Sequence, residues 1–281
     1  MKFRAKMNVA YVRAFHNVLS TMAKLSKNGC ALKLDQDNMY FIMNESGISG
    51  FSAWCQMECK NFFEEYVLEG VTEDAPSIYL ELQPGQMAQS LALLKTAKDS
   101  IEMVKMKLTR KHHQACLSFV IQMPCDRQCV HDIPVSPIPR KDWSEYAKPE
   151  YEIVSGDFVS VVVPDVKKLK HIVERYKNLG PYVNFEADQT GQLRLSLLSD
   201  RVTLSTHFKD LQVVKNPLAI RKDAEEPVTL NIELKKLASL LGAEHIGSKG
   251  CTTHFVREKL LHISLIRDDI SLEYYLPGVQ V

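Results

Sequence analysis

The stretch DFVSVVVPDVKKLKHIVERYKNLG, residues 157–180, contains the pattern of a strand followed directly by a helix. Its first part is apolar and β-branched, as strands are, and Pro164 with Asp165 suits a helix start. Gly180 and Pro181 suit its end. Apolar residues between these signals recur at the spacing of one helix face: Val166, Leu169, Ile172, Val173, Tyr176 and Leu179. The stretch therefore predicts a strand–helix unit whose other face is basic.

The same order of strand and helix occurs four times in the 281 residues. The other copies begin with MKFRAKM at residue 1, SIYLEL at residue 77 and PVTLNIEL at residue 227. The predicted strands start near residues 3, 78, 157 and 228, so the spacings are 75, 79 and 71 residues. Such near-equality indicates four copies of one unit. The helices are expected in the windows 8–28, 84–98, 164–179 and 232–243.

Further β-rich segments follow each helix, so strands outnumber helices. This favours an α+β fold of antiparallel sheets with helices packed on one face. Five of the twelve prolines fall within residues 124–149, which suggests an extended crossover between two similar domains. We expect an N-terminal domain at 1–130, a crossover at 131–156 and a C-terminal domain at 157–281.

Composition narrows the class of protein. A hydrophobic content of 45% and a charged content of 25% are typical of a soluble globular chain. No apolar run approaches the roughly 18 residues that span a bilayer, and the N-terminus does not have the pattern of a secretory leader. Seven cysteines without a repeating pattern favour reduced thiols over a disulfide framework. We therefore expect an intracellular protein without membrane contact.

Positive charge gathers on the four predicted helices. Their windows hold twelve basic and three acidic residues, a net charge of +9 in a chain of +1, which leaves −8 elsewhere. The basic residues are Arg13, Lys24, Lys27, Lys95, Lys98, Lys167, Lys168, Lys170, Arg175, Lys177, Lys235 and Lys236. Solvent-facing helices are often lysine-rich without any function, which is the simplest alternative. If the four repeats lie side by side, however, their basic faces form a strip that attracts a polyanion through its phosphates.

Several short blocks resemble a known family. They are MKFRAK at residue 1, WCQ at Trp54, FFEEYVLEGV at Phe62, IYLEL at Ile78, HDIPV and IPRKDW between His131 and Trp143, THFKDL at Thr206 and DDISLEYYLP at Asp268. Four strand–helix units and the final EYYLPG resemble the sliding-clamp fold of proliferating cell nuclear antigen. The blocks together are closer to the Hus-one-type subunits of the heterotrimeric nine-one-one checkpoint clamp.

The resemblance implies a ring subunit without catalytic activity or cofactor. Together with one Rad-nine-type and one Rad-one-type subunit it would encircle double-stranded DNA at damage sites, independently of sequence. A clamp loader would place the ring there, and the ring would recruit checkpoint and repair proteins. The family also implies residence in the nucleus, with the unassembled chain present in the cytoplasm.

Helix dimensions agree with a ring around DNA. Three subunits with four helices each supply twelve helices. Packed ~9 Å apart, these form a circle ~108 Å round and ~34 Å across. Subtracting a helix radius of ~5 Å on each side leaves a hole of ~24 Å, and duplex DNA is about 20 Å wide. Contacts with DNA are therefore expected to be loose and long-range, which permits sliding.

Clamp subunits join by pairing exposed sheet edges, which indicates where neighbours attach. We expect the edges in the segments 116–122 and 193–199, which carry few charges. The interface residues are then Cys116, Leu117, Phe119, Ile121, Leu193, Leu195 and Leu197. The alternative is that both segments are ordinary interior strands.

Partners of clamps commonly insert a hydrophobic peptide beneath the crossover. The matching positions here are Ile133, Val135, Ile138, Tyr275 and Pro277. The alternative is that these residues only hold the crossover against the core.

Other chemistry has little support. Cys125, Cys129 and His131 are close in sequence, but their spacing differs from that of a zinc site, so no metal is expected. His131 beside Asp132 suggests a metal-dependent nuclease as a rival, although adjacent strand residues point to opposite faces. A homotrimeric replication clamp is a second rival with the same fold, and a binding scaffold without DNA is a third.

Overall fold

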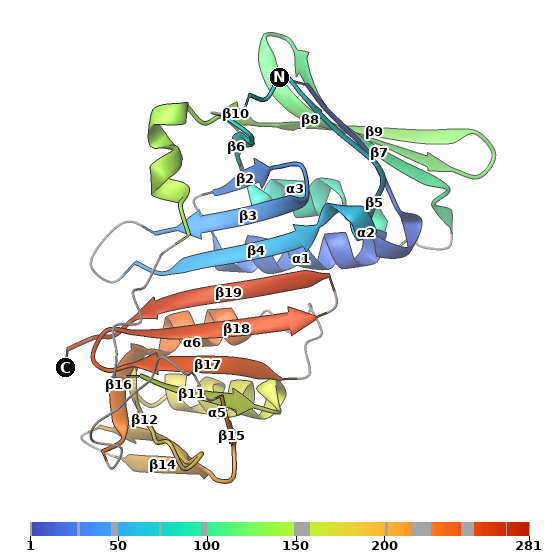
Figure 1. Cartoon of the computed structure of the whole chain (residues 1–281). Helices are drawn as coiled ribbons and strands as arrows, with labels where there is room; N and C mark the ends of the chain where they lie inside the picture. The colour runs from blue at the N-terminus through green and yellow to red at the C-terminus, as the bar shows by residue number, and fades with distance from the viewer. Residues whose placement is uncertain are drawn as a thin grey trace. The chain divides into compact units, whose positions relative to one another are not determined.

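The computed structural model describes residues 2–26, 29–45, 50–72, 75–96, 100–148, 158–199, 202–214, 226–242, 250–267 and 269–280. The chain divides into two compact units (Figure 1). The first unit comprises Met1–Met43, Trp54–Ala147 and Asp268–Ser271. The second unit comprises Asn44–Ala53, Lys148–Arg267 and Leu272–Val281.

The first unit contains two antiparallel sheets and a group of helices. Its strands are β1 (Lys2–Met7), β2 (Cys30–Leu34), β3 (Asn38–Asn44), β4 (Ser52–Glu58), β5 (Phe63–Glu69), β6 (Ile78–Leu82), β7 (Met103–Lys111), β8 (Gln114–Met123), β9 (Arg127–Pro134) and β10 (Ser136–Pro137). Its helices are η1 (Val9–Tyr11), α1 (Val12–Leu25), α2 (Cys59–Phe62), α3 (Pro84–Ser90), α4 (Leu93–Thr96) and η3 (Arg140–Tyr146). The sheet orders are β5-β1-β7-β8-β9 and β10-β6-β2-β3-β4.

The second unit repeats this plan. Its strands are β11 (Phe158–Val163), β12 (Tyr182–Ala187), β13 (Leu193–Leu198), β14 (Thr203–Phe208), β15 (Gln212–Val213), β16 (Val228–Glu233), β17 (Cys251–Val256), β18 (Leu260–Arg267) and β19 (Ile270–Pro277). Its helices are α5 (Val166–Lys177) and α6 (Leu234–Leu241). The strands are ordered β14-β13-β12-β16 in one sheet and β19-β18-β17-β11-β15 in the other.

All four predicted strand–helix units are present, because each follows from a local pattern. Strands β1, β6, β11 and β16 lead into α1, α3, α5 and α6. The Asp165 side chain caps α5 by accepting the backbone N–H of Lys168 at 3.0 Å, as the sequence predicts for a helix start. The second window differs from the prediction of one helix over 84–98. A turn at Leu91 separates α3 from α4, and the side chains of Leu91 and Leu94 are both fully buried.

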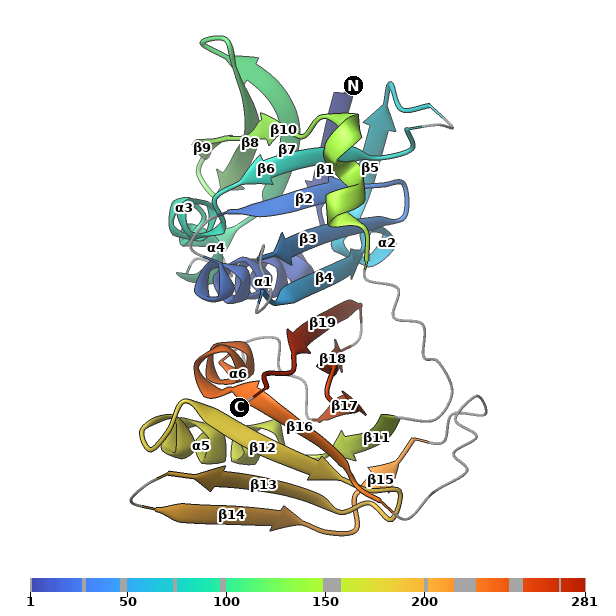
Figure 2. The same cartoon turned by 90° about the vertical axis from the view of Figure 1, so that its left-hand side faces the viewer.

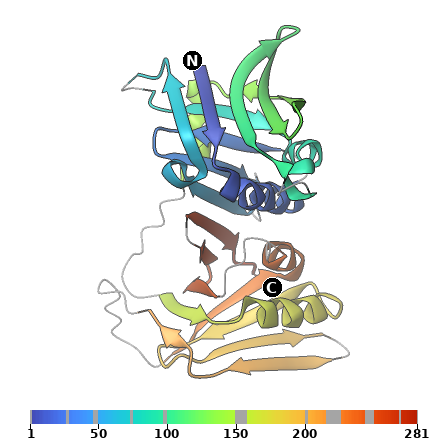
Figure 3. The ribbon, with the colours of Figure 1, turned by 90° about the vertical axis from the view of Figure 1, so that its right-hand side faces the viewer.

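Each unit buries the apolar stripe of its helices against its sheets. In the first unit, the ring of Phe15 on α1 lies 6.5 Å from Phe41 of β3 and 6.2 Å from Phe119 of β8. In the second unit, Phe185 of β12 lies 5.5 Å from Phe255 of β17. Helix α1 packs on α3 and α4, and α5 packs on α6. Figure 2 shows α1, α3 and α4 lying together, and Figure 3 shows α5 beside α6.

The end of the first unit differs from the predicted crossover. Residues 131–134 were expected in an extended connection, but they complete β9, which pairs along its whole length with β8. The chain then forms the short β10 and the 3-10 helix η3. The Trp143 side chain anchors η3: its Nε1 donates to the Ile138 carbonyl at 3.0 Å, and its ring stacks on Tyr79 at 4.6 Å.

Candidate nucleic-acid interface

Helix α5 presents a basic face to solvent. Lys167 is exposed near the middle of this face. Lys168 and Arg175, which are seven residues apart, are exposed together on one flank, whereas Lys170 and Lys177 are half-buried on the other. The opposite stripe of α5 is buried in the second unit. The packing of the apolar stripe therefore directs the lysines outward.

Acidic neighbours balance only part of this charge. The Lys168 Nζ lies 3.6 Å from an oxygen of Asp165, and the Lys177 Nζ lies 2.8 Å from one of Glu174. The Lys168 backbone N–H, with the Lys168 charge, holds the pKa of Asp165 below its ordinary value, so this carboxylate stays ionised. Five basic residues against two acidic ones leave α5 and its cap with a net charge of +3.

Helix α6 contributes less positive charge than α5. Lys235 is exposed, but Lys236 is half-buried and its Nζ lies 3.2 Å from Glu233. Most of the remaining residues of α6 are buried against the sheets. The positive charge of the second unit's helices therefore lies mainly on α5.

In the first unit, the helices carry fewer cations. Arg13 and Lys24 on α1 and Lys95 on α4 are exposed. The buried His16 links α1 to the backbone of Ala88 on α3, and its pKa is lowered by burial and by the nearby Lys95. Lys95 lies on α4, which packs on α1. Lys27 and Lys98, also predicted to face DNA, lie outside the described residues.

The prediction of the sheet edges is wrong. Strand β8, with Cys116, Leu117, Phe119 and Ile121, pairs with both β7 and β9, so it is an interior strand. Strand β13, which carries the other three predicted residues, pairs with both β12 and β14. Leu193, Leu195 and Leu197 are buried in the second unit. The interior alternative is therefore correct for both segments.

The edges of these two sheets lie one strand further along. Within the described residues they are β5 and β9 in the first unit, and β14 and β16 in the second. The predicted edges were placed by position in the chain, and the scarcity of charge in these segments was wrongly taken as support. Charged residues protect edges from unwanted pairing, and β9 indeed carries Arg127 and Asp132, whereas the interior β8 carries no charged residue.

The predicted peptide-binding positions fall in different units and are partly inaccessible. Ile133 and Val135 are buried in the first unit, and the Ile138 backbone N–H donates to the Tyr79 carbonyl at 2.9 Å. Tyr275 is buried in the second unit, whereas Pro277 is half-buried. The buried positions favour the alternative that they hold the chain to the core. Peptide binding there stays a prediction.

Asp132, the sequence neighbour of His131, is engaged by other side chains. Asp132 is held by Lys111 and also hydrogen-bonds Ser118, which together lower its pKa. Cys125 lies in the β8–β9 turn, at a φ of 62°. No cluster of three or more potential metal ligands occurs among the described residues. Within the same residues, no helix is long and apolar enough to cross a membrane.

The two similar units, with helices lying against antiparallel sheets, define a DNA sliding-clamp fold. Proliferating cellular nuclear antigen of Entamoeba histolytica superposes with a TM-score of 0.73 at 11% identity, covering 99% of each chain. The PCNA of Thermococcus kodakaraensis gives 0.68 at 13% identity, covering 99% of this chain and all of the other.

Sequence comparison then gives the particular family. The profile of the Hus1-like proteins matches residues 1–280, so the chain belongs to the Hus1-like family. It is 33% identical over 290 residues to "Checkpoint protein HUS1" of Homo sapiens, covering 99% of this chain and 100% of that protein. It is 27% identical over 288 residues to "Checkpoint protein Hus1-like" of Drosophila melanogaster, covering 99% of both.

Proposed function

We propose that this checkpoint clamp subunit forms a heterotrimeric ring with one Rad-nine-type and one Rad-one-type subunit, and that the ring encircles duplex DNA at damage sites. The observation that carries the proposal is the outward basic face of α5, repeated more weakly on α1 and α4. In the clamp fold these helices would line the hole. The ring would have no catalytic activity of its own.

The proposed contacts are with phosphates and do not depend on base sequence. Long lysine and arginine side chains on helices attract DNA through charge and the release of counterions. Such contacts weaken steeply with added salt and are not tied to one position along the duplex, which permits sliding. Checkpoint and repair proteins would then be held on DNA by binding the ring.

We infer that β9 and β14 are the edges that join neighbouring subunits. The other edges are less available, because β16 already accepts hydrogen bonds at Asn231 from Val279, at 2.9 Å, and at Thr229 from Glu258. Strand β5 carries Glu64, Glu65 and Glu69 and no basic residue, so it is more strongly charged than β9, whose Arg127 and Asp132 have opposite signs. Val130 on β9 is 50% exposed, and Leu198 beside β14 is 84% exposed, so each available edge has an apolar side chain to bury.

A topological experiment tests the ring. The three chains would be co-expressed, purified and loaded by the clamp loader onto a nicked circular plasmid, and the bound complex separated by gel filtration at high salt. A ring stays on the circle and is lost after one restriction cut, because it slides off the ends. Equal retention on circular and linear DNA would contradict encirclement, and a stable homotrimer of the pure chain would favour a replication clamp.

A matched pair of substitutions tests the subunit edge. Leu198→Glu places a charge beside β14 and should abolish assembly, while the variant stays folded because the side chain is already exposed. Ile266→Glu, at a residue 66% exposed on β18, serves as the control and should assemble normally. Assembly is measured by light scattering of the co-expressed complex. Equal assembly of both variants would remove β14 from the interface.

We propose that the assembled ring works in the nucleus, where its DNA is, and that the unassembled chain is also present in the cytoplasm. The basic residues in the helices never form a long run, so import would depend on a partner chain. A fluorescent fusion should therefore leave the nucleus when the partner subunits are depleted. Unchanged nuclear fluorescence would refute dependence on the partners.

A further inference from the structure

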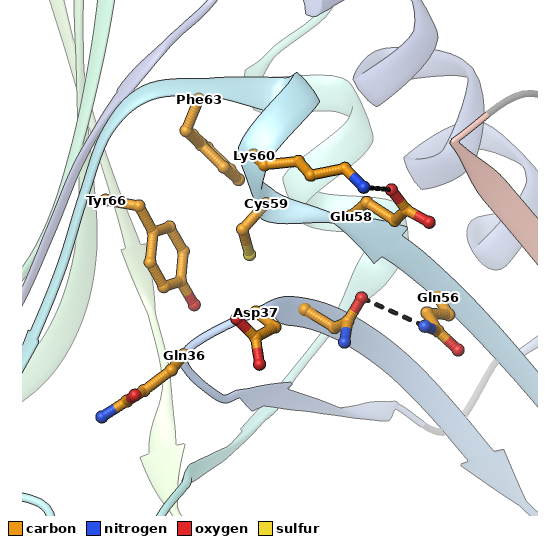
Figure 4. A pocket seen from close by; sticks show the side chains of 9 residues that line it. Gln36, Asp37, Gln56, Glu58, Cys59, Lys60, Phe63 and Tyr66 are labelled. Carbon is orange, nitrogen blue, oxygen red and sulfur yellow. Dashed lines mark hydrogen bonds and ion pairs between the residues drawn. The ribbon is translucent and has the colours of Figure 1, made fainter.

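The first unit contains an open cavity of about 440 Å³ that the DNA-facing helices do not use. It is lined by Gln36, Asp37, Asn38, Gln56, Glu58, Cys59, Lys60, Phe63 and Tyr66 (Figure 4). These residues come from the β2–β3 turn, the first residue of β3, the end of β4, α2 and the first half of β5. The volume is within the range of pockets that bind a small molecule or one large side chain.

Hydrogen bonds fix the walls of the cavity before any ligand arrives. The Asp35 carboxylate accepts the backbone N–H groups of Asp37 and Asn38, at 3.1 and 2.7 Å. The Cys59 backbone N–H donates to the Asp37 carbonyl at 2.8 Å, which ties the turn to α2. The Gln56 Nε2 donates to the Asn38 Oδ1 at 3.0 Å. The site is therefore preorganised, which lowers the entropy cost of binding.

The two sides of the cavity differ in chemistry. Figure 4 shows Phe63 and Tyr66 on one side, Glu58 and Gln56 on the other, and Cys59 and Asp37 between them. The Phe63 and Tyr66 rings lie 5.3 Å apart, and Phe63 is buried. Gln36, Asp37 and Lys60 are exposed. The cavity thus offers an aromatic wall for apolar groups and a carboxylate-bearing rim for a cation.

The cavity lies in a negative potential. Burial first, and then the carboxylates of Asp35 and Asp37, raise the pKa of the Cys59 thiol to about 12. Burial, then the neighbouring Cys59 and finally Asp35, raise the pKa of Tyr66. Both groups therefore stay neutral at physiological pH. The charged lining residues are Asp37, Glu58 and Lys60, so the carboxylates outnumber the cation and the net charge of the lining is −1. Within the described part of the chain, no cation lies within 4.0 Å of the Asp37 carboxylate.

We propose that this cavity binds an arginine side chain of a partner protein. The alkyl part would lie along Phe63 and Tyr66, and the guanidinium would lie between the Asp37 and Glu58 carboxylates. A guanidinium presents five donors in one plane, which suits carboxylates with amide oxygens beside them on Gln36 and Gln56. Lysine has three donors on a point charge, and an anion or a purely apolar group leaves the carboxylates unmatched.

Lys60 regulates access to the site. Its Nζ lies 2.8 Å from the Glu58 carboxylate, so an arriving guanidinium competes with this ion pair. Lys60 is exposed, and an exposed pair of this kind is easily exchanged. Removal of Lys60 should therefore tighten arginine binding, an effect that a merely structural role of the pair does not predict.

The test uses the full chain and two small probes. N-acetyl-L-arginine methylamide would be titrated against the neutral N-acetyl-L-citrulline methylamide, with binding followed by NMR shifts of the isotope-labelled protein. We expect the arginine probe to bind at least tenfold tighter, with its largest shifts at Tyr66 and Cys59. Equal affinities, or shifts confined to residues outside the cavity, would overturn the proposal.

Three variants sharpen the test. Asp37→Asn should weaken the arginine probe at least fivefold and leave the citrulline probe unchanged, and Lys60→Gln should tighten the arginine probe about threefold. Glu102→Gln removes an exposed carboxylate elsewhere in the first unit and should change neither. Unchanged binding in Asp37→Asn, or weaker binding in Lys60→Gln, counts against the site. The inference does not depend on DNA encirclement, because every measurement uses the chain alone.

Discussion

Helices α1 and α5 have the same place in the repeated strand–helix unit but differ in charge. Each follows a strand and buries one apolar stripe, with α1 extending over 14 residues and α5 over 12. Helix α1 carries only Arg13 and Lys24, whereas α5 carries five basic residues. The comparison shows that packing determines which face points outward, while the side chains on that face determine the attraction for DNA.

The two helices also begin differently. Helix α1 follows a 3-10 turn whose start is capped by the Asn8 side chain, and its own N-cap residue, Tyr11, makes no such bond. Helix α5 is capped directly by Asp165, whose negative charge also suits a helix N-terminus. The more basic helix thus has the stronger N-terminal cap. Substitution of the cap tests folding, whereas substitution of the basic face tests DNA contact.

The largest effect is expected from charge reversal on α5. Replacing Lys167, Lys168, Lys170 and Arg175 by Glu should lower the affinity of the assembled ring for DNA by about 100-fold at moderate salt, since several phosphate contacts are lost. Fluorescence anisotropy over a salt series measures the affinity and its salt dependence. Thermal unfolding should change little, because the buried stripe is intact. An unchanged salt dependence would show that α5 does not face DNA.

Charge reversal on α1 should have a smaller effect on the same measurement. Arg13→Glu with Lys24→Glu removes two cations, and we expect about tenfold weaker binding. If this pair weakens binding as much as the α5 variant, the concentration of charge on α5 has no functional meaning. That result would break the comparison.

His16, buried in the first unit, and His254, half-buried in the second, allow a comparison of stability. Burial, and then the neighbouring His262, lower the pKa of His254 to about 4 from an ordinary 6.5. The unfolded chain therefore binds a proton between these pH values where the folded chain does not, so the free energy of unfolding falls by roughly 2–3 kcal/mol as the pH falls through this window. The pKa of His16 in the first unit is also lowered, so His16 likewise lowers the free energy of unfolding as the pH falls.

Urea unfolding at pH 7, 5.5 and 4.5 measures this slope, and His254→Phe should reduce it. The ring stack with His262, at 4.9 Å, can persist in that variant. Below about pH 4.5 a further loss is expected, because His262, whose Nε2 lies 3.3 Å from a Glu273 oxygen, and the contact with Lys148 lower the pKa of Glu273 to about 2. A slope identical to that of the unmodified chain would exclude His254 as its source.

The smallest effect is expected at the helix starts. Asp165→Ala removes the cap of α5 and should lower the free energy of unfolding by about 1 kcal/mol. Asn8→Ala, which affects only the short turn before α1, should cost less. Differential scanning calorimetry compares the two variants. A larger loss for Asn8→Ala would mean that the turn before α1 stabilises that helix more than its geometry indicates.

Local sequence patterns predicted the repeated units. They could not predict which strands pair, because strand pairing joins segments that are distant in sequence. The apolar spacing of α5 and its signals at Asp165 and Gly180 lie within 24 residues, so one short stretch contains the information. Which strand lies at a sheet edge depends on neighbours far away in sequence. The apolar β8 was therefore taken for an edge, while β9 and β14 were missed.

The cavity was missed for a related reason. Its lining residues come from two segments that are separated in sequence, 36–38 and 56–66. Neither segment has a residue spacing that indicates a binding site. Asp37 and Glu58 look like ordinary surface acids until the β2–β3 turn is hydrogen-bonded to α2. Only the folded unit shows that they share a hollow with Phe63 and Tyr66.

If β9 and β14 join the partner subunits as proposed, these two edges have a consequence for the abundance of the protein in a cell. A chain made in excess of its partners would keep both edges open, together with the exposed Leu198, and would become a substrate for chaperones and proteases. The steady amount of this subunit would then be limited by the scarcer of its partners. Degradation would maintain the stoichiometry, without any need for matched rates of synthesis.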